Sequence, residues 1–380
     1  MSQQETDAGL GLAVLSAQGF HWVLRLIRRL HGPLPVWEAG VERLKGLGVK
    51  QPQIDRYLAA RDGIDLPRMK EAVDASGSCF IPYGSARIPP LVRELAFAPA
   101  GLFVAGDPSL FDEFCRRPRA VVVGTRKASS YGLANTSRLV APLVAAGVVV
   151  VSGLALGIDA AAHRAAVEAG GLTVAVLGCG TDIVYPARNG ALRRRILDYG
   201  LLVSEFPPGM RPTRWTFPLR NRIMAALGHG VIVVEAGSRS GALITVEHAL
   251  ELGRTIFAVP GPVFVEGSAG VNRLIYEGAC PIIDPDFMVE EFARDTRNEM
   301  GKPCMQAPGA APAASRRGDE GGASVTARNL ILQALYRGPR TIDEAAACTG
   351  LEVCETARGI GLLELSGLVR QSGPGRYSAV

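Results

Sequence analysis

Six short apolar runs, each followed by a glycine-containing turn and an alanine-rich stretch, limit most strongly how this chain can fold. Strands that are apolar on both faces and alternate with helices belong to parallel sheets that are covered on both sides. The pattern therefore predicts a doubly wound α/β domain with a Rossmann-like parallel sheet, whose ligands bind beyond the carboxyl ends of the strands. The six runs are AVVVG at 120–124, GVVVVSG at 147–153, LTVAVLG at 172–178, GLLVSEF at 200–206, GVIVVEAG at 230–237 and TIFAVPG at 255–261.

The segments on either side of these runs have other patterns. Apolar residues at helical spacing before residue 75 predict a small helical domain. Its LKGLG turn, at 44–48, suggests a helix-hairpin-helix or sterile-alpha-motif-like module, or only a link between two helices. Pro, Gly, Ala and Ser without periodicity predict a flexible linker ahead of a last unit of helices and a hairpin. We expect the helices of this unit at 327–336, 341–348 and 352–365, the second of them opened by a capping box of Thr341 and Glu344. We therefore expect a helical domain at 1–75, an α/β domain at 76–296, a linker at 297–324 and a C-terminal domain at 325–380.

Composition narrows the class of protein. The formal net charge of +5 on 380 residues is modest, so any affinity for nucleic acid must come from local clusters of charge. Seven cysteines without a CxxC pair suit a reduced cytoplasm, and the N-terminus has neither a signal peptide nor a membrane span. The chain lacks GxxxxGK[ST], GxSxG and HExxH, and it carries no histidine pair at ligand spacing. We therefore expect a soluble protein that is not an enzyme and needs no metal or cofactor.

The segment FPPGMRPTRWTFPLRNR, at 206–222, combines arginines with aromatic residues. Guanidinium groups pair with phosphate oxygens, and aromatic rings stack on unpaired bases of any sequence. No acidic residue occurs between Glu205 and Glu235. The segment predicts a groove for single-stranded nucleic acid. The alternative is a loop with solvated arginines whose aromatic residues cover the sheet.

Turns that suit anions follow three of the predicted strands. Glycine allows a close approach to the backbone, and the amide groups at a helix N-terminus attract phosphate. Asp159 and His163 share a face of the helix after the second run, where we favour a structural or phosphate-facing role over acid–base catalysis. The residues singled out in these turns are Arg126 and Lys127 after the first run, Ser152, Gly153 and Gly157 after the second, and Ser240, Gly241 and Thr245 after the fifth.

Eight short motifs occur in series, namely GTR at 124–126, SGLALGIDAAAH at 152–163, GCGTDIVYP at 178–186, SEFPPG at 204–209, FPLRNRI at 217–223, VVEA at 233–236, SGALIT at 240–245 and VPG at 259–261. In this order they resemble the DNA-processing protein A (DprA) family over roughly residues 80–290. The resemblance implies an extended Rossmann fold that binds single-stranded DNA, forms a homodimer and loads the RecA recombinase during natural transformation. It also implies a winged-helix domain after residue 325.

The resemblance also implies roles for individual residues. Arg126, Arg220, Asn221 and Arg222 would contact the DNA backbone, and Phe217 would lie against a base. The sequence departs from the family pattern at Leu156, where many members have Lys or Arg. One phosphate contact is missing there unless Lys127 or Arg214 supplies it.

Two further surfaces have less specific patterns. Leu274 and Ile275 are candidates for the dimer interface, although packing in the core explains them equally well. The C-terminal domain has five acids and one arginine between residues 341 and 365, which would repel phosphates. We therefore interpret it as a protein-contact or regulatory domain, with Arg370 and Arg376 of its hairpin as the alternative DNA contacts.

The sequence as a whole predicts a single-stranded DNA-binding recombination mediator without enzymatic activity. The main alternative is a Rossmann-like nucleotide-binding enzyme related to the lysine-decarboxylase-like phosphoribohydrolases. Those enzymes have a PGGxGT turn with a catalytic Glu, whereas this chain has SRSGALIT at the comparable place. A scaffold that binds no nucleic acid is the third possibility.

Overall fold

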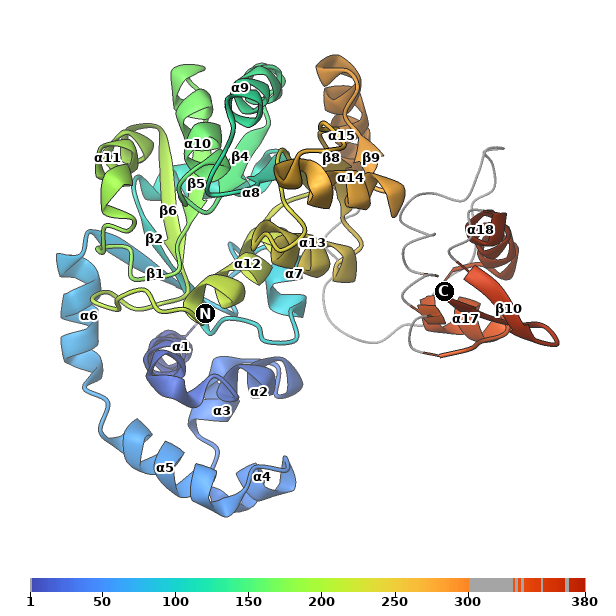
Figure 1. The fold of residues 1–380 in the computed structure, drawn as a ribbon. Helices are drawn as coiled ribbons and strands as arrows, with labels where there is room; N and C mark the ends of the chain where they lie inside the picture. The colour runs from blue at the N-terminus through green and yellow to red at the C-terminus, as the bar shows by residue number, and fades with distance from the viewer. Residues whose placement is uncertain are drawn as a thin grey trace.

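A nine-stranded sheet covered by helices on both faces forms the centre of the molecule in the computed structural model (Figure 1). The structure describes residues 2–300, 331, 334–335, 338–349, 351–365 and 369–379. The strand order is β1-β2-β6-β5-β4-β3-β7-β8-β9, in which the seven strands from β6 to β9 are parallel. The strands are β1 Ser78–Pro82, β2 Gly101–Ala105, β3 Arg119–Val123, β4 Val149–Ser152, β5 Thr173–Val176, β6 Gly200–Ser204, β7 Gly230–Val233, β8 Thr255–Ala258 and β9 Cys280–Pro281.

Helices connect the strands in the alternation that the apolar runs predicted, which confirms the doubly wound fold. All six predicted runs contain a strand, and each strand begins within two residues of the start of its run. The helices of this part are α7 Pro90–Glu94, α8 Pro108–Arg116, α9 Ser130–Ala145, α10 Ile158–Glu168, α11 Gly190–Tyr199, α12 Thr216–Leu227, α13 Ala242–Glu251, α14 Ala269–Tyr276 and α15 Pro285–Met300, with short 3₁₀ turns η2 Ala187–Asn189 and η3 Glu266–Ser268.

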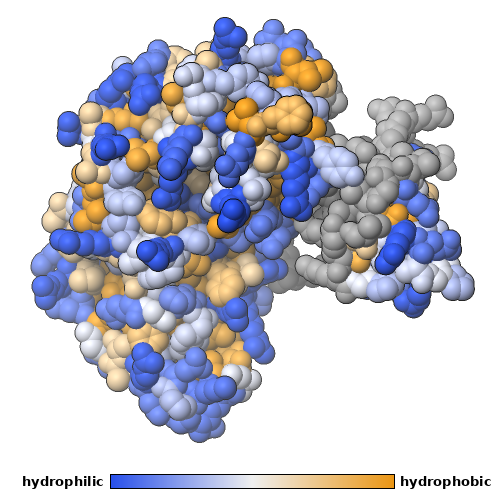
Figure 2. All heavy atoms as spheres, viewed as in Figure 1, coloured by the Kyte–Doolittle hydropathy of each residue, from blue (hydrophilic) through white to orange (hydrophobic). Residues whose placement is uncertain are grey.

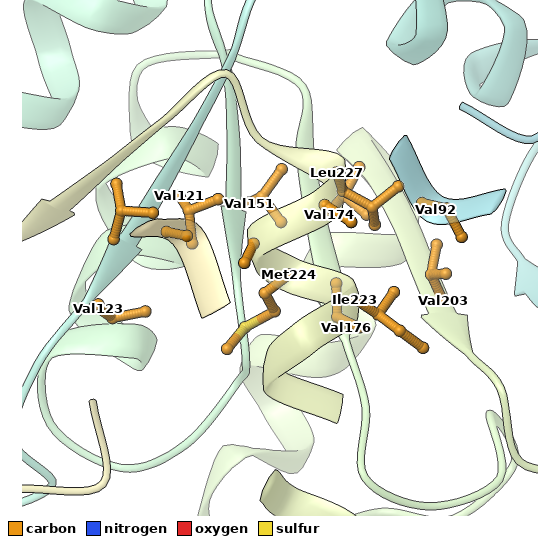
Figure 3. Packing of buried hydrophobic residues seen from close by; sticks show 14 of the residues in the cluster. Val92, Val121, Val123, Val151, Val174, Val176, Val203, Ile223, Met224 and Leu227 are labelled. Atoms are coloured by element: carbon orange, nitrogen blue, oxygen red, sulfur yellow. The ribbon is translucent and has the colours of Figure 1, made fainter. Parts of the chain in front are cut away.

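The strands are apolar throughout because both faces of the sheet are covered. Successive side chains of a strand point to opposite faces. Val121 and Val123 of β3 belong to the cluster that contains α12, whereas Ala120 and Val122 belong to the cluster with α9 and α10. The outer surface is mainly hydrophilic (Figure 2). Figure 3 shows how α12 lays its apolar side chains on the valines of the sheet.

The order of the strands reverses at β3. The chain passes from β3 through β4 and β5 to β6 on one side, and then returns to place β7 on the other side of β3. The loops that follow β3, β4, β5, β6 and β7 all leave from the same edge of the sheet, because these strands are parallel. This edge is the place where such folds bind ligands.

The N-terminal segment is helical as predicted, and it packs on the sheet. Its apolar side chains form one cluster together with Ala100 and Phe103 at the antiparallel pair β1–β2. Gly48 links α4 to α5 in a left-handed conformation, with φ of +85°. The helices are α1 Gln3–Leu15, α2 Val23–Arg29, α3 Pro33–Trp37, α4 Val41–Gly46, α5 Gln51–Asp62 and α6 Leu66–Ala75, with a π-helical turn η1 Ser16–Phe20 after α1.

Three features differ from the sequence-based prediction or lie beyond it. The antiparallel strands β1 and β2 were not predicted. Helix α15 continues to Met300, so the linker predicted at 297–324 begins inside a helix, and its remainder lies outside the described residues. Most of the helix predicted at 327–336 is also outside them. No helix in the described residues is long and apolar enough to cross a membrane.

The C-terminal part contains two helices and a hairpin in the predicted order. These are α17 Ile342–Thr349, α18 Val353–Leu365, β10 Val369–Gly373 and β11 Arg376–Ala379. The predicted capping box at the start of α17 is confirmed. The Thr341 amide donates to the Glu344 carboxylate at 3.0 Å, and the Glu344 amide donates to the Thr341 hydroxyl at 3.2 Å.

Candidate nucleic-acid interface

A cleft of about 550 Å³ lies at the edge of the sheet where the strand order reverses. Loops from five different strands contribute to its wall, so the fold alone brings together segments more than 100 residues apart. Eight of the predicted site residues line it. They are Arg126, Arg214, Phe217, Arg220, Asn221, Ser240, Gly241 and Thr245.

A stack of three side chains crosses the cleft. The guanidinium carbon of Arg126 lies 5.2 Å from the ring centroid of Phe217, a cation–π distance. The ring of Tyr185 lies on Phe217 with centroids 5.6 Å apart and planes tilted by 37°. Tyr185 is 42% exposed. The stack therefore offers an accessible aromatic face beside a positive charge.

Exposed cations surround this stack. Arg126 and Arg214 line the cleft, and neither forms an ion pair within the described part of the chain. Lys127 is also exposed, and its amide donates to the Thr125 hydroxyl at 3.2 Å, but its side chain is not part of the cleft wall. These groups are free to pair with an anionic ligand.

The other aromatic residues of the arginine-rich segment pack against neighbouring aromatic rings outside the cleft, and Trp215 remains 37% exposed. Phe206 is buried, and its ring lies edge-on to Trp215 at 5.8 Å. Trp215 also contacts His21 of the N-terminal segment, with ring centroids 5.1 Å apart. The structural alternative for this segment therefore applies to Phe206 and Trp215, whereas Phe217 faces the cleft.

Arg220 lies at the base of the cleft, and its guanidinium group is already occupied. One nitrogen donates to the carbonyl oxygens of Gly153 at 2.6 Å and Val176 at 2.5 Å, and Nε donates to Asn221 at 3.0 Å. The residue is only 4% exposed. Burial lowers the pKa of Arg220, and the nearby Asp159 partly offsets this effect. Arg220 therefore braces the loop after β4 against the end of β5, and this geometry differs from the predicted backbone contact.

Arg222 faces away from the cleft, in contrast to the prediction. It forms a buried ion pair with Glu205 at 2.5 Å, and both side chains are nearly inaccessible. Consecutive helical residues point about 100° apart, so a DNA contact cannot be carried by every residue of the FPLRNR motif. Asn221 does line the cleft, where its amide donates to the Gly241 carbonyl at 3.3 Å and so joins the loops after β6 and β7.

The loop between β4 and α10 is shaped by its glycines and by Asp159. The Asp159 carboxylate accepts hydrogen bonds from the amides of Gly153 at 3.2 Å and Ala155 at 3.4 Å. Burial raises the pKa of Asp159, and Arg220 lowers it in part. Gly157 has φ of +80°, and a side chain there would meet the Thr125 carbonyl. The carboxylate and Gly157 thus hold this loop beside the turn after β3.

Ser152 and His163 are internal, which differs from the predicted role of Ser152. The Ser152 hydroxyl donates to the Val122 carbonyl at 2.6 Å and is inaccessible. The ring of His163 lies 2.8 Å from the Thr173 hydroxyl, and burial lowers the pKa of His163 to about 3. Ser152 thus ties β4 to β3, and His163 ties α10 to β5. The structural interpretation of His163 agrees with this geometry.

The turn between β7 and α13 forms the opposite wall of the cleft. Ser240, Gly241 and Thr245 all line it. The Thr245 hydroxyl has no hydrogen-bond partner in the described residues, although it is buried. This unused donor, at the start of a helix, suits a phosphate or sugar oxygen.

Tyr185 and Leu156 are residues whose positions sequence reasoning did not assign. Both line a smaller cavity of about 60 Å³, which shares Arg126 and Phe217 with the main cleft. The signal for Tyr185 was its place in the GCGTDIVYP motif at 178–186, in the connection that follows the third predicted strand. Leu156 is half-buried there, so its side chain makes this wall of the interface apolar.

The candidate dimer residues lie mainly inside the protein. Leu274 and Ile275 of α14 are partly buried and pack against the main core. Residues near them are much more exposed, including Phe264, Tyr276 and Ile283. Packing in the core therefore accounts for Leu274 and Ile275, and the accessible apolar side chains of this region are their neighbours.

Comparison with known proteins identifies the family. The model of the family described as DNA recombination-mediator protein A matches residues 79–293, more than half of the chain. The chain belongs to this family. A putative DNA processing protein DprA of Mycobacterium tuberculosis is 42% identical over 277 residues, which cover 73% of this chain and 68% of that protein.

Solved structures of the DNA recombination-mediator protein A family share the fold. The X-ray structure of DNA processing protein A (DprA) from Streptococcus pneumoniae aligns with a TM-score of 0.63 at 34% identity, over 71% of this chain and 93% of that one. The Helicobacter pylori protein, described for its unique single-stranded DNA binding mode, aligns with a TM-score of 0.51 at 29% identity. That alignment covers 55% of this chain and 94% of the other.

Proposed function

We propose that this chain binds single-stranded DNA in the cleft at the reversal of strand order. The observation that carries the proposal is the stack of Arg126, Phe217 and Tyr185 within the cleft. Exposed guanidinium groups take up phosphates, and an accessible aromatic ring beside them takes up a base. Arg126 and Arg214 line the cleft and supply the charge, and Arg214 or Lys127 replaces the cation that is missing at Leu156.

Single strands fit this arrangement better than duplexes. Bases within a duplex are stacked on one another, so an aromatic side chain reaches a base face only when the strand is unpaired. The partly exposed ring of Tyr185 offers such a contact. The described single-strand binding of the Helicobacter pylori relative supports the same conclusion.

We further propose that the chain acts without catalysis and without a cofactor. The Asp159 carboxylate, which lines the cleft, is held by two backbone amides. The Glu235 carboxylate accepts hydrogen bonds from the amide and hydroxyl of Ser129. Both acids therefore have structural partners, which favours a binding surface over the phosphoribohydrolase-like enzyme.

The family description as a recombination mediator supports a role in handing DNA to a recombinase. We propose that the chain loads RecA onto incoming single strands during natural transformation, in the cytoplasm. Homodimerisation would place two clefts in one particle. The exposed Phe264, Tyr276 and Ile283 beside α14 suit such an interface, since exposed apolar residues mark contact sites.

The C-terminal part is proposed to be a winged-helix domain that contacts protein. Its acidic helix α18 disfavours phosphate. Arg376 of the hairpin pairs with Glu344 at 3.1 Å, which partly neutralises one of the two arginines that could contact DNA.

A thermal-shift experiment tests the proposed ligand. Only a ligand that binds the native state raises the melting temperature. We expect a single-stranded oligonucleotide to raise it and a nucleoside monophosphate to leave it unchanged. Stabilisation by the monophosphate alone would favour the enzyme, and stabilisation by neither would contradict the proposal.

RecA loading is tested by following RecA assembly on an oligonucleotide that is already coated with single-strand-binding protein. We expect the chain to speed this assembly. A variant with Arg126→Ala should speed it less, because it holds the strand more weakly. An equal rate with and without the chain would contradict the mediator role while leaving DNA binding untouched.

A further inference from the structure

A group of exposed arginines lies outside the cleft, on η2 and α11. Arg188, Arg194 and Arg195 are exposed, and none forms an ion pair in the described part of the chain. We call these three residues the α11 surface. Arg193 differs from them, because its guanidinium group is partly buried and donates to the Thr181 carbonyl.

The α11 surface begins at the rim of the cleft. Arg188 follows Tyr185 by three residues, and Tyr185 lines the cleft. The intervening turn is fixed, because Nδ2 of the Asn189 side chain donates to the carbonyls of Leu154 at 2.9 Å and Ala155 at 3.3 Å. These bonds attach η2 to the loop after β4, whose Ala155 also lines the cleft. The position of Arg188 beside the aromatic stack is therefore set by the fold.

The α11 surface then leads away from the rim. Helix α11 connects the end of β5 to the start of β6, so it runs back along the side of the sheet (Figure 1). With a rise of about 1.5 Å per residue, Arg194 and Arg195 lie about 9 Å further along than Arg188. The buried Leu192 and Ile196 anchor the helix, so these arginines occupy its outer side.

Acidic side chains near the α11 surface cancel part of this charge. The Asp182 carboxylate, at the start of the same connection, accepts from the Gly209 amide at 2.9 and 3.0 Å. Helix α11 itself carries one carboxylate, that of Asp198, and two exposed arginines, so its exposed side chains have a net positive charge. Helix α10, which packs beside α11, contributes the exposed Arg164 and the exposed Glu168, which offset each other. The local field therefore favours an anion.

We propose that the α11 surface binds the phosphate backbone of a single strand that leaves the cleft past Tyr185. The inference rests on the proposed function of the cleft and extends its footprint. Cations at the rim that continue along one helix suit a flexible polyanion, which gains a contact with each added phosphate. The α11 surface thus determines how affinity grows with the length of the strand.

The test compares two triple variants of the full chain. One variant is Arg188→Gln, Arg194→Gln and Arg195→Gln, which leaves the structural Arg193 in place. The matched control is Arg43→Gln, Lys50→Gln and Arg68→Gln, which removes three exposed charges from the N-terminal helices. Both variants are titrated with labelled oligothymidine of about 6 and about 20 nucleotides, lengths that bracket typical single-strand sites. Melting temperatures confirm that each variant is folded.

We expect the α11 variant to bind the short oligonucleotide as the unmutated chain does and the long one at least tenfold more weakly. For the long strand, the slope of log affinity against log salt concentration should become less steep by about 2, because three phosphate contacts are lost. The proposal for the α11 surface, but not that for the cleft, would be overturned by either of two results. One is an equal loss of affinity in the two triple variants, and the other is an equal loss of affinity for both lengths of oligonucleotide. A failure of the unmutated chain to bind either oligonucleotide would overturn the function of the cleft as well.

Discussion

Arg126 and Arg220 line the same cleft but have opposite surroundings. Arg126 is exposed, and its described contact is the face of Phe217. Arg220 is buried and donates to two carbonyls of the surrounding loops. A ligand can recruit the first guanidinium without breaking any protein hydrogen bond. The second can be recruited only at the cost of the bonds that shape the cleft.

Replacing each arginine separates these roles. Arg126→Ala should weaken single-strand binding by about 1 kcal/mol and reduce the salt slope by about 0.7, because one exposed phosphate contact is lost. Its melting temperature should not change. Arg220→Met should lower the melting temperature, because buried carbonyls lose their donors. DNA titration and thermal unfolding of both variants measure this, and an unchanged melting temperature for Arg220→Met would contradict the bracing role.

His163 gives the fold a predictable response to acid. Its folded-state pKa of about 3 is below the ordinary value of 6.5, so the unfolded chain binds the proton first. The stability that His163 confers is complete above pH 6.5 and is lost as the pH falls toward 3. Burial lowers the pKa of His229 as well, to about 2, with the same sign.

The replacement His163→Asn should flatten this dependence. Between pH 6 and 4, the slope of the unfolding free energy against pH should decrease by up to about 1.4 kcal/mol per pH unit. His31→Asn is the matched control, because His31 is exposed and asparagine tolerates its positive φ. Urea unfolding at several pH values measures both variants, and an equal slope in the two would contradict the assignment.

At the scale of elements, the sequence predicted the parallel strands because each is apolar on both faces. Strands β1 and β2 escaped prediction, since they are antiparallel and one of their faces is covered by the N-terminal helices. The motifs correctly indicated which loops meet at the cleft, because strand ends in a parallel sheet share one edge. The motifs could not show which of their side chains face the cleft. Arg222 and Ser152 both belong to motifs at this edge of the sheet, but their side chains are internal.

The loop between β4 and α10 depends on Gly157 for its shape. A residue other than glycine loses about 1–2 kcal/mol when it adopts a positive φ. Gly157→Ala should destabilise the protein by more than this, because the new Cβ also meets the Thr125 carbonyl. Gly209→Ala is the control, since Gly209 has φ of +81° and open space around it. Urea unfolding compares them. Similar losses of stability would mean that the close approach to Thr125 is unimportant.

At the scale of the whole molecule, the N-terminal helices share a hydrophobic cluster with β1–β2, so they belong structurally to the sheet. The cleft draws all its residues from positions 123–245. A chain that ends at residue 300 retains the whole of α15 and the complete cleft. Single-strand binding should therefore be independent of the C-terminal part.

Truncation after residue 300 should leave single-strand affinity within about threefold of that of the full chain at a fixed salt concentration. The acids of α17 and α18 would repel phosphates, so their removal costs no attraction. Titration of one labelled oligonucleotide against both proteins measures this. A loss of tenfold or more, about 1.4 kcal/mol, would mean that the hairpin with Arg370 and Arg376 binds DNA.

The salt dependence of DNA binding tests the central claim most directly. A labelled oligothymidine and a duplex of equal length are titrated with the full chain over a series of salt concentrations. Three to five phosphate contacts in the cleft predict that log affinity for the single strand falls with log salt concentration with a slope of about −2 to −3.5. The single strand should also bind more tightly than the duplex. An affinity that does not change with salt, or duplex binding as tight as that of the single strand, would contradict the account.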